Sequence, residues 1–180
     1  MKDKGKEKIK ATSEDVFAAF AQVLGFAAPE LDPGSGFKVI KGAIENWDLE
    51  ITCSQNNQAT QTTITITNPP QTELEFEILG GVWKDKNCIE TQNTTFDTAV
   101  CCKSKQDAML LELIGSQSIR LSIQALVDCC FQLTKDQFQF TENLDFSQDL
   151  FPKYMNVVSV MVRIATFLST PRSGEIKAKS

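Results

Sequence analysis

The chain contains no histidine, which limits the chemistry that its side chains can perform. Histidine is the most frequent catalytic base, so Ser-His and Cys-His nucleophiles and His-containing metal sites are excluded. Phosphate cradles are missing too, because no glycine-rich turn leads from an expected strand into a helix with a lysine at the required place. Carboxylates and cysteines remain. For an enzyme of this kind, the candidate catalytic residues are Asp97, Glu112 and Cys101.

Asp97 follows Phe96 at the expected start of an apolar strand, where a carboxylate needs a partner. Arg120 is the arginine nearest in sequence within the apolar stretch that follows. Most ion pairs close to a core are structural. The sequence therefore predicts a structural ion pair between Asp97 and Arg120, with a catalytic use of Asp97 as the alternative.

The cysteines form two adjacent pairs and two isolated residues. Side chains of adjacent residues in a strand point to opposite faces, so neither pair can chelate a metal as C-x-x-C does. No secretion signal precedes them, and the chain is large enough to bury a core without disulfides. We therefore expect free, reduced thiols, no metal site and no cofactor, with a zinc or disulfide role as the alternative. The cysteines are Cys53, Cys88, Cys101, Cys102, Cys129 and Cys130.

The composition and net charge of the chain indicate which class of protein it belongs to. The chain of 180 residues is 42% hydrophobic and 23% charged, which is typical of a soluble globular protein. A formal net charge of -5 argues against a nucleic-acid partner. No stretch of about 18 apolar residues occurs, so we expect no integral membrane segment and a cytoplasmic location.

Apolar periodicity predicts the elements that position these residues. Repeats of three and four residues indicate a helix at 13–24, two short helices at 106–114 and 116–127, and a long helix at 150–168. Alternation predicts strands beginning near Phe37, Trp47, Thr62 and Glu73, a strand at 96–102 and a hairpin at 129–141. Residues 116–127 also satisfy the strand period, but Ser116 after Gly115 is a plausible helix cap, which favours a helix.

These elements predict an α+β fold: an antiparallel sheet with an N-terminal helix, a central pair of short helices and a long C-terminal helix packed on it. We expect a disordered basic tail at 1–12, one globular domain at 13–170 and a loose tail at 171–180. Within the domain, the strand-rich part covers 37–103, and the helix, hairpin and helix part covers 104–170.

The apolar faces of the central and C-terminal elements should form the core, because they bring the densest apolar stretches of the chain together. The residues expected to be buried are Leu110, Leu111, Ile114, Ile123, Phe131, Tyr154, Val158, Met161 and Ile164.

Gly42, Phe96-Asp97, Leu110-Leu111 and the pair Phe138 and Phe140, in this order of elements, resemble a set of uncharacterised bacterial proteins of unknown function. The resemblance spans about 37–168 and implies no activity. We therefore expect a soluble bacterial domain that is a non-catalytic protein-interaction or ligand-binding module, whose partner is an unknown protein or small ligand. The alternative is an enzyme that uses carboxylate or cysteine chemistry without histidine.

Overall fold

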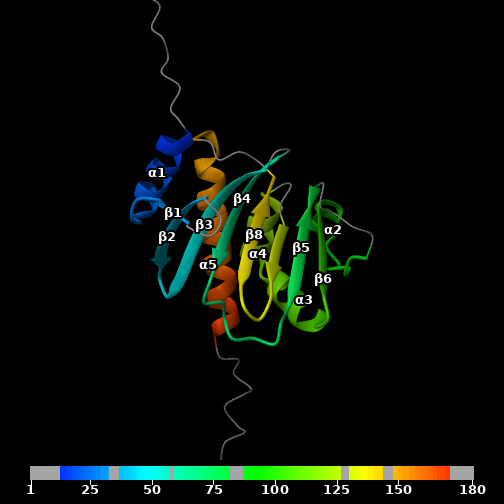
Figure 1. Cartoon of the computed structure of the whole chain (residues 1–180). Coiled ribbons are helices and arrows are strands. Elements are labelled where there is room, and N and C mark those ends of the chain that lie inside the picture. The colour runs from blue at the N-terminus through cyan, green and yellow to red at the C-terminus, as the bar shows by residue number, and fades with distance from the viewer. Residues whose placement is uncertain are drawn as a thin grey trace, which may run out of the picture.

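A computed structural model describes residues 13–32, 37–56, 59–81, 87–126, 130–143 and 148–170. Within these residues the chain forms one antiparallel sheet of eight strands together with helices that include a long C-terminal one (Figure 1). The predicted α+β class is therefore confirmed. The tails predicted at 1–12 and 171–180 lie outside the described residues.

The sheet has the strand order β1-β2-β3-β4-β8-β7-β5-β6. Its strands are β1 (Glu30–Leu31), β2 (Lys38–Ile44), β3 (Trp47–Asn56), β4 (Ala59–Ile66), β5 (Phe76–Gly80), β6 (Val100–Ser104), β7 (Cys130–Leu133) and β8 (Phe138–Glu142). Pairing of β4 with β8 joins the two halves of the sheet, with Ile64 opposite Phe140. The predicted hairpin at 129–141 thus lies at the centre of the sheet, although β5, α2, β6, α3 and α4 separate it from β4 in the chain.

The helices are α1 (Ser13–Leu24), α2 (Thr94–Ala99), α3 (Asp107–Gly115), α4 (Gln117–Gln124) and α5 (Phe151–Ser169), with a short 3-10 turn at Gln148–Leu150. Figure 1 shows α4 and α5 behind the sheet. The helical prediction for 116–127 is confirmed in its type by α4, which ends earlier, at Gln124, and whose buried residues Ile119 and Ile123 are one helical turn apart.

Alternation along the strands gives the sheet two different faces. Ile64, Ile66, Phe138 and Phe140 are fully buried in the core. Between them, Thr65 lies opposite Gln139, Gln139 lies opposite Gln132, and these polar side chains are half-buried. One face therefore packs on the helices, and the other is polar.

The strand predicted at 96–102 is wrong in its first half. Thr94–Ala99 form α2, and β6 begins only at Val100. The reason is a local cap: the Asn93 side chain accepts a hydrogen bond of 3.0 Å from the Phe96 backbone N–H, which satisfies a free donor of the first helical turn. Phe96 is nevertheless fully buried, as a core position should be.

Other boundaries also differ from the prediction. The fourth strand begins at Phe76 rather than Glu73. Between α1 and β2 the chain also forms the two-residue strand β1, which the sequence analysis did not predict and which pairs with β2. In β2, Gly42 leaves room for the Phe26 ring, since a Cβ there would come within 2.2 Å of it.

Eight of the nine predicted core residues are buried, and Leu111 is not. Leu110, its neighbour in α3, is fully buried, whereas Leu111 is 37% exposed. Leu110, Leu113 and Ile114 form the buried face of α3, and Leu111, about 100° further around the helix from Leu110, lies at the edge of that face. Leu111 lies at the mouth of a cavity described below.

Candidate functional site

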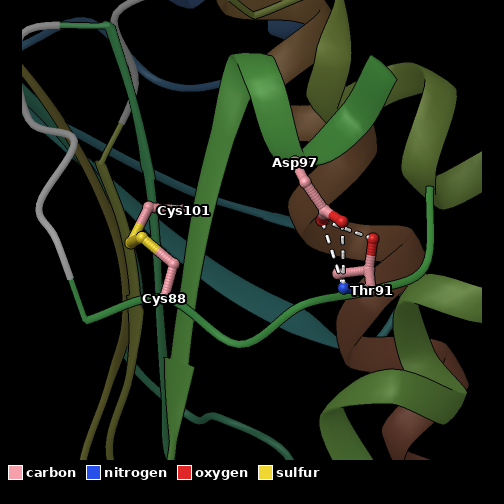
Figure 2. Close-up of a disulfide and its surroundings, with 4 residues drawn as sticks. All are labelled: Cys88, Thr91, Asp97 and Cys101. Atoms are coloured by element: carbon pink, nitrogen blue, oxygen red, sulfur yellow. Dashed lines mark hydrogen bonds between the residues drawn. A yellow bond between two sulfur atoms is a disulfide. The ribbon is translucent and has the colours of Figure 1, made fainter. Parts of the chain in front are cut away.

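Cys88 and Cys101 form a disulfide, with their Cα atoms 5.0 Å apart (Figure 2). The prediction that all cysteines are free thiols is therefore wrong. Sequence reasoning considered only the adjacent pairs, but the partner of Cys101 is an isolated cysteine thirteen positions earlier. The disulfide occupies the Cys101 thiolate, which can no longer act as the nucleophile proposed from the sequence.

Cys53 and Cys130 are free thiols, Cys102 is buried and takes no part in this disulfide, and Cys129 lies outside the described residues. Burial raises the pKa of the Cys130 thiol, and the negative charge of Glu77 raises it further. A raised pKa lowers the fraction of reactive thiolate at neutral pH. Within the described part of the chain, no group of three or more cysteine, aspartate or glutamate side chains could hold a metal ion.

The segment after Cys88 wraps the edge of the sheet. β6 is the last strand of the sheet, so its outer edge would be open to pairing with another chain. The Ile89 backbone N–H donates a hydrogen bond of 2.8 Å to the Cys102 carbonyl at this edge. Together with the disulfide, this contact holds the segment 88–91 against β6.

Asp97 in α2 binds Thr91, the last residue of the segment 88–91, through hydrogen bonds. Its Oδ1 accepts a hydrogen bond of 2.6 Å from the Thr91 hydroxyl, and both carboxylate oxygens lie 3.2 Å from the Thr91 backbone nitrogen (Figure 2). We name residues 88–101 the disulfide loop: it is closed by Cys88–Cys101 and braced inside by Thr91–Asp97.

Arg120 has a different partner from the one the sequence predicted. Its Nη1 donates a hydrogen bond of 3.3 Å to the Ile114 carbonyl at the end of α3. Its Nε is buried and has no hydrogen-bond acceptor within the part of the chain that the structure describes. The two residues of the predicted ion pair thus use separate contacts, Asp97 to Thr91 and Arg120 to Ile114. Glu112, the remaining catalytic candidate, is exposed on α3.

A cavity of about 190 Å³ lies between the disulfide loop and the junction of α3 with α4. Its rim is exposed at Gln92, Leu111 and Gly115, and Ile114 forms a buried part of its wall. Gln92 has a left-handed backbone, with φ of 62°. Such a conformation costs free energy in a residue other than glycine, and strained residues of this kind are enriched at functional sites. We name this feature the Arg120 cavity; Thr91, Gln92, Leu111, Ile114, Gly115 and Arg120 line it.

Two wider depressions lie on the polar face of the sheet. One, of about 330 Å³, includes Glu77, Lys103 and Gln132, and the other, of about 650 Å³, includes Lys41 and Glu50. In both, oppositely charged or polar side chains already contact each other: Lys41 pairs with Glu50 at 3.4 Å, and Gln132 donates to Glu77 at 3.3 Å. The Arg120 cavity differs, because its guanidinium has no acidic partner among the described residues.

Sequence reasoning missed a buried polar cluster on the helix side of the sheet. Glu142 of β8 is 1% exposed and forms an ion pair with Lys153 of α5. The Tyr154 hydroxyl lies 3.3 Å from the Thr62 hydroxyl, and both residues are fully buried. Burial raises the pKa of Tyr154, and the charge of Glu142 adds to this effect. In β8, Glu142 follows the buried residues Phe138 and Phe140 at the same spacing of two residues. This alternation was the signal in the sequence that a polar side chain lies on the core face.

Comparison with known proteins finds one likeness of fold. No protein-family model matches the chain. No curated protein matches it in sequence either. None of the described helices is both long enough and apolar enough to cross a membrane. A crystal structure of the mycobacterial trehalose monomycolate transport factor A, TtfA, superposes with a TM-score of 0.61 and 12% identity, covering 87% of this chain and 93% of that one. The chain is thus similar to TtfA in fold.

Proposed function

We propose that the protein is a non-catalytic ligand-binding module whose binding site is the Arg120 cavity. One observation carries this proposal: the groups that sequence analysis selected for chemistry are used to build the wall of a cavity. Cys101 closes the disulfide loop, and Asp97 braces it through Thr91, a residue that lines the cavity. Concave sites with a few convergent polar groups are typical of ligand binding.

The enzyme alternative has less support. Carboxylate catalysis requires a carboxylate within hydrogen-bond reach of the substrate. Neither Asp97 nor Glu112 lines the cavity, and the carboxylate of Asp97 is already bound by two donors of Thr91. The fold of a transport factor, TtfA, is compatible with a role in binding, although at 12% identity it carries no information about the ligand.

The disulfide bears on location. The cytoplasmic location expected from the sequence stays a prediction, and the Cys88–Cys101 bond argues against it, because structural disulfides persist in oxidising compartments and are rare in reducing ones. Alkylation of the protein in freshly quenched cells would decide the point. A bridge found intact there supports an oxidising compartment, and two free thiols at these positions support the cytoplasm.

A fragment titration followed by backbone amide resonances tests the proposed function. The library should contain small acids, amines, sugars and neutral amides, and each mixture should also be assayed for chemical conversion. We expect saturable shifts centred on Gln92, Leu111 and Gly115 without turnover. Glu112→Gln is the control for the enzyme alternative, since Glu112 lies on α3 but does not line the cavity.

Two outcomes would overturn the proposal. One is conversion of a compound that Asp97→Asn or Glu112→Gln abolishes while the melting temperature stays unchanged. The other is saturable binding confined to the polar face of the sheet, with the cavity resonances unmoved.

A further inference from the structure

We infer that the Arg120 cavity binds the carboxylate group of a small aliphatic acid. This inference rests on the proposed function and adds the chemical class of the ligand. Its basis is the combination of one cationic group without an acidic partner, an apolar wall beside it, and a volume suited to a short chain.

The cationic group is the Arg120 guanidinium. Its fork of N–H donors matches the two oxygens of a carboxylate. Among the described residues its one hydrogen bond runs from Nη1 to the neutral Ile114 carbonyl, and its buried Nε has no acceptor there. A guanidinium has five N–H donors, and only one of them is used among the described residues, so an acceptor placed in the cavity beside Arg120 is favoured.

The apolar wall is formed by Leu111 and Ile114, which lie one helical turn apart on α3. Leu111 is 37% exposed although its neighbour Leu110 is fully buried. A ligand with an aliphatic portion would cover the Leu111 side chain while its charged end meets Arg120. The cavity volume of about 190 Å³ has room for a chain of a few carbon atoms rather than for a lipid tail.

The charges nearby favour a monoanion. Asp97 hydrogen-bonds to Thr91, which lines the cavity, so a negative charge already stands one side chain away. Repulsion from this carboxylate grows with the charge of the ligand. A carboxylate, with a single negative charge, meets less of this repulsion than a phosphate, which carries on average more than one negative charge at neutral pH.

The test uses sodium butyrate as the probe, titrated into the full chain at constant ionic strength and followed by the amide resonances of Gln92, Leu111 and Gly115. We expect saturable shifts with butyrate. Butyramide and inorganic phosphate should each bind at least about tenfold more weakly than butyrate. Butyramide has the same shape but no negative charge for Arg120, and phosphate has no aliphatic portion to cover Leu111.

Paired variants locate the binding. Arg120→Gln should weaken butyrate binding by about tenfold or more, whereas Arg163→Gln, which removes the same charge from an exposed position on α5, should leave it within about twofold. Leu111→Glu places a competing carboxylate at the rim and should abolish binding. Leu121→Glu, at a 54% exposed leucine of α4 outside the cavity, is its matched control.

Equal affinity for butyrate in Arg120→Gln and Arg163→Gln would overturn the inference, as would equal binding of butyrate, butyramide and phosphate. Both leucine variants change exposed positions, so they keep the test valid if Arg120→Gln fails to fold. If butyrate fails but another fragment class moves the same resonances, the ligand class is wrong and the proposed function stands. If no fragment moves them, both are wrong.

Discussion

The Asp97 carboxylate in α2 receives both donors of Thr91, the backbone N–H and the hydroxyl, six residues earlier in the chain. Thr91 lines the Arg120 cavity, and Asp97 does not. This contact fixes the position of the cavity wall relative to α2, and it gives the carboxylate that seemed most suited to catalysis a structural role.

Asp97→Ala should lower the free energy of unfolding by about 1 to 3 kcal/mol, because it removes hydrogen bonds to a charged acceptor. Chemical denaturation of Asp97→Ala, Thr91→Val and the double mutant should show coupling of about 1 kcal/mol between the two sites. The matching cycle of Asp97→Ala with Arg120→Ala should show coupling below about 0.5 kcal/mol. Strong coupling in the second cycle and none in the first would restore the ion pair predicted from the sequence.

Removing the disulfide should destabilise the protein without changing its fold. A loop closed across thirteen positions restricts the unfolded chain, which corresponds to about 3 kcal/mol. The double variant Cys88→Ser, Cys101→Ser should melt at a lower temperature and lose affinity at the Arg120 cavity.

Alkylation of the unfolded protein without reductant checks the same bridge by mass. The chain has six cysteines, and the disulfide occupies two of them, so at most four labels should be added. Addition of six labels to protein purified under oxidising conditions would contradict the bridge.

Tyr154 should make stability fall at high pH. Its pKa is raised by burial, and then by the charge of Glu142, so the folded state keeps the phenolic proton more tightly than the unfolded state. Its contribution is fully present below the ordinary tyrosine pKa of about 10, and above that pH it is lost by about 1.4 kcal/mol per pH unit. Urea titrations should therefore show a steeper loss of stability above about pH 10 in the wild type than in Tyr154→Phe, and parallel curves below it. Identical slopes would mean that the tyrosine titrates normally in the folded protein.

Removing one partner of the Glu142–Lys153 ion pair should lower the free energy of unfolding more than replacing both partners with apolar side chains. Glu142 is almost completely buried, with 2% of its side chain exposed, whereas 23% of the Lys153 side chain reaches solvent. Lys153→Met leaves a buried carboxylate without its cation and should cost about 3 kcal/mol or more. The double variant Glu142→Leu, Lys153→Met should recover most of this loss in thermal melts. A double variant less stable than Lys153→Met would contradict this account.

Adjacent leucines in α3 provide a matched pair for the core. Leu110→Ala should cost about 2 to 5 kcal/mol, because it opens a cavity at a fully buried position. Leu111→Ala, at a 37% exposed position, should cost well under half of that. Equal losses would mean that Leu111 packs against the core in solution.

Local signals in the sequence determined most of the elements of this fold. Period-two alternation around Ile51, Ile64 and Phe140 predicted strands, and three-and-four spacing around Met161 predicted α5, because these patterns reflect side-chain direction within one element. The exclusion of histidine chemistry also needs only the sequence. Element boundaries were less certain, and α2 was missed because the Asn93 cap outweighed the strand-like residues that follow it.

Contacts between elements were decided by the tertiary structure alone. Cys88 meets Cys101, Thr91 meets Asp97, and Arg120 meets the Ile114 carbonyl because α2, β6, α3 and α4 pack in one particular arrangement. No periodicity encodes these distances, since each joins side chains whose separation depends on how the chain turns between them. The sequence thus identified the residues capable of chemistry, and the packing of the elements turned Cys101 and Asp97 into supports of a cavity and left the Arg120 guanidinium at its wall.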